Sequence, residues 1–236
     1  CKRRINEGLA RARAHSPFLR MQLELLPQVA SALAEGDRDT AFAAARSEES
    51  GEDAMAALRR GRSAWATALA IADLAGLMPL EALTRALSDL ADRSLDRAIA
   101  AAISERTPGE PARGFAAIAL GKLGSRELNY SSDIDPILLY DPATLPRRAR
   151  EEPGQAALRI AQRVVELLQK RDGNGYAFRI DLRLRPSPEV TPIALPVDAA
   201  IGHYESSALP WERAAFIRAR HAGGDAALGR YFLDAI

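Results

Sequence analysis

Apolar residues recur at the spacing of an amphipathic helix through most of the first hundred residues. Ser16 and Pro17 predict a helix start, because serine caps helices and proline suits the first turn. Pro27 predicts the end of that helix or a kink. An acidic stretch at 47–53 predicts a connection between helices. The apolar segments with helical spacing are 18–26, 41–45, 55–58, 69–77 and 80–95.

The pattern changes after a proline- and glycine-rich break at 107–111. Short apolar runs predict strands at 115–120, 137–140 and 176–185, and an amphipathic helix is predicted at 156–170. A turn at Asp172-Gly173-Asn174-Gly175 would lead into the third strand, and two or three helices would finish the chain.

These elements predict an α+β fold. A helical N-terminal region, residues 1–107, would pack on a domain of residues 108–236. That second domain would hold a small mixed β-sheet flanked by helices.

Candidate chemistry begins with Asp133 and Asp135. In a strand, alternate side chains share a face, so both carboxylates would project to one side and Ile134 to the other. In the predicted third strand, Phe178, Ile180, Leu182 and Leu184 would likewise form the apolar face. The opposite face would carry Arg179, Asp181, Arg183 and Arg185.

If these two strands are neighbours, three carboxylates converge. Asp133, Asp135 and Asp181 then form a catalytic and metal-binding set that suits a hard cation such as Mg²⁺. Arg183 and Arg185 would contact phosphate. The alternatives stay open: Asp133 and Asp135 as a helix cap or solvated strand face, and Asp181 paired with a neighbouring arginine.

A glycine-rich turn precedes the two carboxylates. At Gly124-Ser125 the backbone amides and the hydroxyl are predicted to approach a phosphate, because glycine has no Cβ to block it. Lys122 and Arg126 are weaker candidates for the same phosphate. Glu127 and Asn129 are expected only to brace the turn.

The string GKLGSRELNYSSDID, with DLRLRP and WER further on, resembles the DNA polymerase beta-like nucleotidyltransferase superfamily. Within it the chain is similar to the glutamine synthetase adenylyltransferase/adenylyl-removing family. The resemblance implies magnesium-dependent nucleotidyl transfer, with ATP, ADP and phosphate as ligands and glutamine synthetase as protein substrate. It also implies regulation by the PII signalling protein.

The Trp211-Glu212-Arg213 form resembles the N-terminal, adenylyl-removing domain of that family, in which phosphate displaces AMP and releases ADP. Adenylylation from ATP is the first alternative. A degenerate domain kept for partner binding is the second. It is supported by Pro136, which stands where the family has an aliphatic residue and would suit a strand start or a bulge.

Composition limits which binding partners and which cellular location are expected. The net charge of +1 gives no reason to expect nucleic-acid or membrane-surface binding, and no apolar run reaches the length of a membrane span. Cys1 is the only cysteine, which excludes an internal disulfide and agrees with a cytoplasmic location. Trp211 to Arg213 are expected to form a buried brace. His15, His203 and His221 are expected to be structural, without carboxylate partners.

Overall fold

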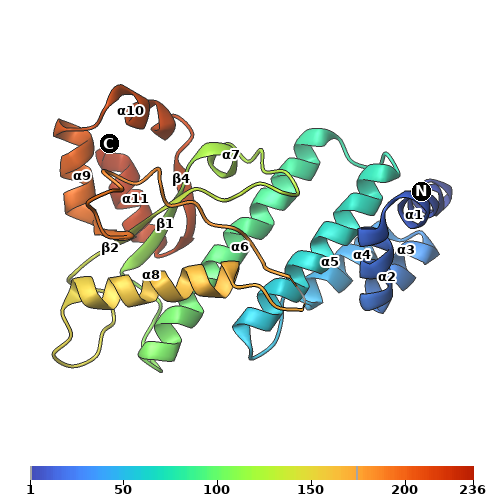
Figure 1. The fold of residues 1–236 in the computed structure, drawn as a ribbon, viewed down its shortest axis with the longest axis horizontal. Coiled ribbons are helices and arrows are strands. Elements are labelled where there is room, and N and C mark those ends of the chain that lie inside the picture. Colours follow the sequence, from blue (N-terminus) through green and yellow to red (C-terminus); the bar gives the residue numbers. More distant parts are fainter. Residues whose placement is uncertain (1, 174) are drawn as a thin grey trace.

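The computed structural model describes residues 2–173 and 175–236. Cys1 and Asn174, on which the disulfide argument and part of the predicted turn rest, lie outside the described residues. The molecule is elongated, with small helices at the end that holds the N-terminus and the sheet towards the other end (Figure 1).

The N-terminal half is helical, as predicted. Ser16 caps the second helix, since its hydroxyl accepts a hydrogen bond from the Leu19 amide at 3.2 Å. Pro27 begins a new helix, and residues 48–53 form the expected connection. The helices are α1 (Lys2–His15), α2 (Pro17–Leu25), α3 (Pro27–Glu35), α4 (Arg38–Ser47), α5 (Ala54–Leu74) and α6 (Leu80–Arg106).

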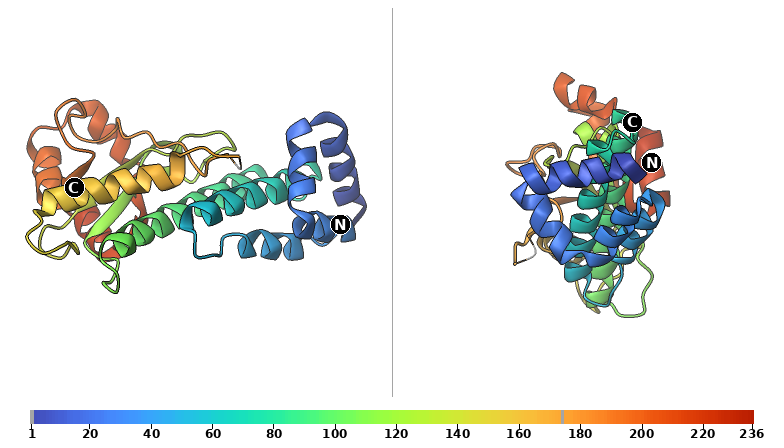
Figure 2. Two further views of the ribbon diagram at one scale, coloured as in Figure 1. Left: turned by 60° about the horizontal axis from the view of Figure 1, so that its bottom comes forward. Right: turned by 90° about the vertical axis from the view of Figure 1, so that its right-hand side faces the viewer.

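The two long helices α5 and α6 connect the ends of the molecule (Figure 2). Helices α1 to α4 gather around one end of α5, where they share a separate apolar core. The end of α6 that is farther from α1 to α4 packs against the sheet. Its buried side chains, such as Leu95 and Ile99, belong to the same core cluster as Phe115. The boundary near residue 107 stays a prediction, and this cluster runs across it.

Four strands form the sheet in the order β3-β2-β1-β4. Strand β1 is antiparallel to both β2 and β4, whereas β2 is parallel to β3, so the sheet is mixed as predicted. The strands are β1 (Phe115–Ala119), β2 (Pro136–Tyr140), β3 (Ala194–Pro196) and β4 (Arg220–Gly224).

Alternate residues of β1 face different helices. Ala117 and Ala119 pack in the cluster with α6 and α8 (Pro153–Gln169). Ala116 and Ile118 pack in the cluster with α9 (Val197–Ser206) and α11 (Ala226–Ala235). The remaining helices are α7 (Gly121–Gly124) and α10 (Pro210–Phe216). The α+β prediction is therefore confirmed.

The predicted third strand at 176–185 is wrong. That segment makes only an isolated parallel bridge, between Ile134 and Ile180, and β3 occupies the corresponding edge of the sheet instead. The chain turns after Leu182, whose carbonyl oxygen accepts from the amide of Arg185. A turn there takes the following residues away from any strand partner.

Strand β4 was not predicted either. Its sequence, RHAGG, lacks an apolar alternation, and it becomes a strand by pairing with β1. A Cβ added to Gly223 would lie 2.7 Å from the amide nitrogen of Asp96, so glycine permits the close approach of α6. In the described part of the chain, no helix is both long and apolar enough to cross a membrane.

Candidate functional site

The carboxylates meet beside the end of β1. The amide of Ile134 donates to the carbonyl of Arg179 at 3.0 Å, and the amide of Asp181 donates to the carbonyl of Ile134 at 2.9 Å. Ile134 is fully buried, as predicted. This short parallel contact places Asp181 next to Asp133 and Asp135, although only one residue pair forms the bridge.

Asp135 lies closest to the backbone of α7. A Cβ added to Gly121 would be 2.8 Å from Oδ2 of Asp135, and Gly121 has a φ of +55°, a conformation that favours glycine. The amide of Leu120 donates to the carbonyl of Asp135 at 3.1 Å. Gly121 was not among the predicted site residues, although the glycine spacing in GKLG was the available signal.

The electrostatics of Asp135 differ from those of its neighbours. Burial, together with the nearby charges of Asp181 and Asp133, raises the pKa of the half-buried Asp135 carboxyl to about 6. Arg183 and Lys122 act in the opposite direction. Asp135 makes no ion pair within the described residues, so negative charge accumulates around it.

Asp133 and Asp181 each form an ion pair with an arginine. Arg179 pairs with Asp133 and also donates to the carbonyl of Ser131 at 2.7 Å. Arg183 Nε lies 2.8 Å from one oxygen of Asp181, and this guanidinium lowers the pKa of the Asp181 carboxyl. The alternative that Asp181 pairs with an arginine on its own segment is therefore observed.

The three carboxylates suit a divalent cation by their chemistry. They supply hard oxygen ligands, and the pKa of Asp135, raised by burial and by the charges of Asp181 and Asp133, shows that a negative charge here is unfavourable without a cation. Among residues 2–173 and 175–236, no three carboxylate, imidazole or thiol side chains are already arranged to hold a metal ion. Metal binding would compete with the two arginine pairs.

Arg185 has a different environment from Arg183. Its guanidinium donates to the carbonyl oxygens of Leu182 at 2.7 Å and Pro192 at 3.2 Å. It also donates to those of Pro188 at 2.6 Å and Thr191 at 3.1 Å. Four bonds to one loop make Arg185 an organiser of that loop, while its phosphate role stays a prediction.

The Gly124-Ser125 turn packs against β4. A Cβ on Gly124 would lie 2.2 Å from the carbonyl oxygen of Arg218, so glycine is required by this contact. The Ser125 hydroxyl lies 3.2 Å from the carbonyl of Gly121 and 3.0 Å from Oε2 of Glu127. Phosphate binding by this turn also stays a prediction, and Glu127 braces it as expected.

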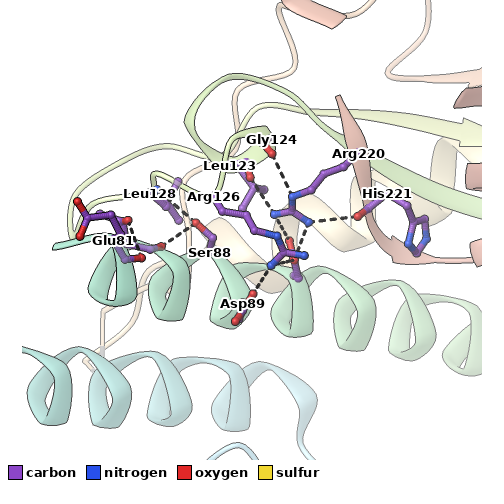
Figure 3. A network of polar contacts seen from close by, with 11 residues as sticks. Glu81, Ser88, Asp89, Leu123, Gly124, Arg126, Leu128, Arg220 and His221 are labelled. Carbon is purple, nitrogen blue, oxygen red and sulfur yellow. Dashed lines mark hydrogen bonds and ion pairs between the residues drawn. The ribbon is translucent and has the colours of Figure 1, made fainter. Parts of the chain in front are cut away.

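An arginine–aspartate network fastens the turn to α6 (Figure 3). Arg220 pairs with both oxygens of Asp92, at 2.6 and 2.9 Å, and donates to the carbonyl of Leu123 at 2.8 Å. Arg126 pairs with Asp89 and has a φ of 59°, which is unusual for a residue with a side chain. The network fixes the position of α7 and thus of Gly121.

The structure tests two further predictions, one at Pro136 and one at residues 211–213. Pro136 is the first residue of β2, a position that tolerates a missing N–H, so the strand-start interpretation is confirmed. The buried brace at Trp211 to Arg213 is wrong except for Glu212, which is 4% exposed, because Trp211 is 49% exposed.

His203 was predicted to lack a carboxylate partner, and that prediction is wrong. Its Nε2 lies 3.0 Å from Oε1 of Glu212, and Oε2 of Glu212 accepts from the amide of Leu209 at 2.7 Å. The pair joins α9 to α10. Sequence spacing did not reveal it, because the turn between the two helices decides which side chains meet.

A hollow of about 1110 Å³ opens beside this pair. Arg183 and Arg185 line one side, and His203, Trp211 and Glu212 line another. Since Arg183 also pairs with Asp181, the hollow adjoins the carboxylate cluster.

Comparisons with known proteins show the family of the chain. The family described as glutamate-ammonia ligase adenylyltransferase matches residues 6–235. A bifunctional glutamine synthetase adenylyltransferase/adenylyl-removing enzyme of Caulobacter vibrioides is 47% identical over 178 residues, 71% of this chain and 18% of the relative.

Proteins with the same name in two other bacteria are also similar. The Xanthobacter autotrophicus protein is 43% identical over 206 residues, 83% of this chain and 21% of the relative. The Rhizobium meliloti protein is 37% identical over 253 residues, 97% of this chain and 26% of the relative. The chain thus spans about a fifth to a quarter of the length of these relatives.

Proposed function

The chain belongs to the glutamate-ammonia ligase adenylyltransferase family, a family of enzymes, and from this premise we propose that it removes AMP from adenylylated glutamine synthetase. The reaction is a magnesium-dependent phosphorolysis. Inorganic phosphate attacks the phosphorus of the AMP group, the bond to the tyrosyl oxygen breaks, and ADP is released. The enzyme works in the cytoplasm.

One observation carries the proposal. Asp133, Asp135 and Asp181 come from two separated segments, and Asp135 has a pKa raised to about 6 by burial and by the other two carboxylates. Such mutual repulsion is costly for a protein that only has to fold. It is typical of a site that positions charge for attack at phosphorus.

In the proposed mechanism Asp133, Asp135 and Asp181 hold Mg²⁺, which when bound neutralises charge on the phosphoryl oxygens. Gly121 leaves room for Asp135 against the backbone of α7. Arg183, 84% exposed in its side chain, lies where the hollow meets the carboxylates and binds the anionic groups of the substrates. The α6 network keeps the turn in place.

Removal of AMP is favoured over addition by two features of the sequence. Trp211-Glu212-Arg213 has the form that resembles the adenylyl-removing domain, and a long helical region, α1 to α6, precedes the sheet. Glutamine synthetase is the protein substrate by the names of the relatives, and PII is proposed as a regulator from the family resemblance alone.

The test is phosphorolysis by the isolated chain. Adenylylated glutamine synthetase, inorganic phosphate and Mg²⁺ are expected to yield ADP and the unmodified enzyme. Omission of phosphate and an Asp133→Asn variant are the controls, and both should abolish ADP release. Absence of ADP with the wild-type chain contradicts the proposal.

Adenylylation of glutamine synthetase from ATP is the second candidate, because the names of the relatives include both activities. Labelled ATP with unmodified glutamine synthetase distinguishes it: transfer of AMP without phosphorolysis would assign the chain to the opposite reaction. The third candidate, a degenerate domain for partner binding, predicts no magnesium-dependent nucleotide binding by calorimetry.

A further inference from the structure

His203 is held in a fixed orientation by a buried carboxylate. Glu212 is 4% exposed and accepts two hydrogen bonds, from the ring of His203 at 3.0 Å and from the amide of Leu209 at 2.7 Å. The amide bond fixes the carboxylate, and the carboxylate fixes the imidazole. Such an arrangement is more than a satisfied core histidine needs.

The pairing determines which ring nitrogen carries hydrogen. An ionised carboxylate only accepts hydrogen bonds, so Nε2 of His203 is the N–H donor. Within residues 2–173 and 175–236, Nδ1 has no hydrogen-bond partner and is not sealed from solvent. Nδ1 is therefore the nitrogen that can exchange a proton with a bound molecule.

His203 shares a hollow with Arg183, the arginine that pairs with Asp181. Its imidazole lines this hollow of about 1110 Å³. A substrate whose phosphorus lies at the carboxylates would extend its other group into this hollow. The exposed Trp211 and Leu209 line the same hollow and suit an aromatic group.

We propose that His203 is a further catalytic residue, the general acid that protonates the tyrosyl oxygen when AMP is removed. This inference rests on the proposed function and deepens it. A basic leaving group such as tyrosinate departs more easily when it receives a proton as the bond breaks. Glu212 is the positioning residue that stabilises the imidazolium and directs Nδ1.

The step balances with phosphate as the only co-reactant. A phosphate oxygen forms a bond to the phosphorus of AMP, and the bond from phosphorus to the tyrosyl oxygen breaks. The electron pair of that bond goes to the tyrosyl oxygen, which takes the proton from Nδ1 of His203. The attacking hydrogen phosphate releases its proton to solvent, the neutral imidazole takes up a proton from solvent, and the products are ADP and the tyrosine hydroxyl.

Other charged groups face the imidazole. Arg183, Arg185 and Glu189 line the hollow from the loop, and Glu212 approaches from α10. On α9 itself, the ring of Tyr204 contacts the imidazole edge-on, with ring centroids 5.2 Å apart. Because several charged groups surround the imidazole, the test compares two leaving groups at one pH.

The experiment uses His203→Gln with two substrates at saturating phosphate and Mg²⁺. One is AMP–tyrosine in glutamine synthetase, and the other is the p-nitrophenyl ester of AMP, whose leaving group departs without a proton. Loss of the general acid is expected to slow the first about 100-fold and to change the second by less than about 3-fold. Glu212→Gln should show the same selectivity with a smaller loss.

The matched control is His15→Gln, the same replacement at an exposed histidine at the end of α1, which should leave both rates unchanged. The comparison within one variant is independent of how much of it folds. Equal losses on both substrates, or no loss on either, would overturn the assignment to His203. A wild-type chain that releases ADP from neither substrate would instead overturn the proposed function, and this inference with it.

Discussion

Two groups of aspartates and arginines lie on either side of α7, and they differ in how fully they are bonded. On α6, both carboxylate oxygens of Asp92 accept hydrogen bonds from the guanidinium of Arg220, which also donates to backbone carbonyls. Around Asp135, the neighbouring carboxylates hold exposed arginines, and Asp135 itself makes no ion pair in the described part of the chain.

The difference shows how the same residue types serve structure or chemistry. Arg220 and Asp92 are mostly buried, so breaking their pair would leave Asp92 with only the longer contact of 3.8 Å to Arg126. Arg183 is 84% exposed, so its pair with Asp181 is weak and can open for a ligand. The first group is predicted to govern stability and the second to govern activity.

The largest expected effect is the loss of activity in Asp135→Asn. The amide keeps the shape but removes the charge, so AMP removal should fall by at least about 1000-fold, since metal-assisted steps depend on the ligand set. The free energy of unfolding should rise at pH 7, because repulsion by Asp133 and Asp181 is relieved. Turnover near the wild-type rate would show that Asp135 is not in the catalytic site.

Arg220→Met is expected to act on stability. Removing the guanidinium leaves the buried Asp92 with only the contact of 3.8 Å to Arg126 and should lower the free energy of unfolding by about 3 kcal/mol, measured by denaturant titration. Arg230→Met, at an exposed position on α11, is the control. If adding Asp92→Asn restores none of the loss, the pair is not the cause.

Arg185→Lys and Arg183→Lys should separate the two roles within one loop. Lysine cannot replace the four carbonyl contacts of Arg185, so that variant should lose about 1–2 kcal/mol of stability. Arg183→Lys should leave Tm unchanged and raise the KM for phosphate several-fold. If Arg185→Lys instead raises the KM for phosphate and Arg183→Lys lowers stability, Arg185 is the residue that binds phosphate.

Gly121→Ala tests the close approach of Asp135. A side chain at a φ of +55° costs about 1 kcal/mol, and its Cβ would lie 2.8 Å from Oδ2 of Asp135, so both stability and activity should fall. Gly76→Ala has a similar φ of +64° with no atom within 4 Å of the added Cβ, so only stability should fall. Equal activity in the two variants contradicts this role of Gly121.

A further expected effect is the pH dependence of stability. The pKa of Asp135 is about 6 in the folded chain against an ordinary value of 3.8, so protonation favours folding. This contribution is fully present below pH 3.8 and is lost as pH rises through 6. It amounts to about 1–2 kcal/mol after allowance for solvent screening, and it should vanish in Asp135→Asn.

Local patterns were enough to predict much of the fold. The helix start at Pro17, the helix end before Pro27 and the strands β1 and β2 follow from capping, proline geometry and apolar runs, which act within a few residues. That Asp133 and Asp135 share a face followed from the alternation of an extended chain, whereas their convergence with Asp181 was predicted only if the two segments are neighbours, and the bridge between Ile134 and Ile180 meets that condition.

Tertiary contacts decided the rest. The chain turns after Leu182, where a strand was predicted, and Arg185 holds the loop through four carbonyls whose positions no periodicity reports. Strand β4 forms by pairing with β1, and its Gly223 admits α6, although its own sequence favours no strand.

The sequence by itself determined which residues carry charge near the site, since the aspartates and arginines stand in short motifs on extended segments. Only the tertiary structure decided which of them are bonded and which remain open. Arg220 meets Asp92, and His203 meets Glu212, because helices and turns far from the motifs set the angles between elements. Burial, which fixes the pKa of Asp135 and the strength of each pair, is a property of that packing.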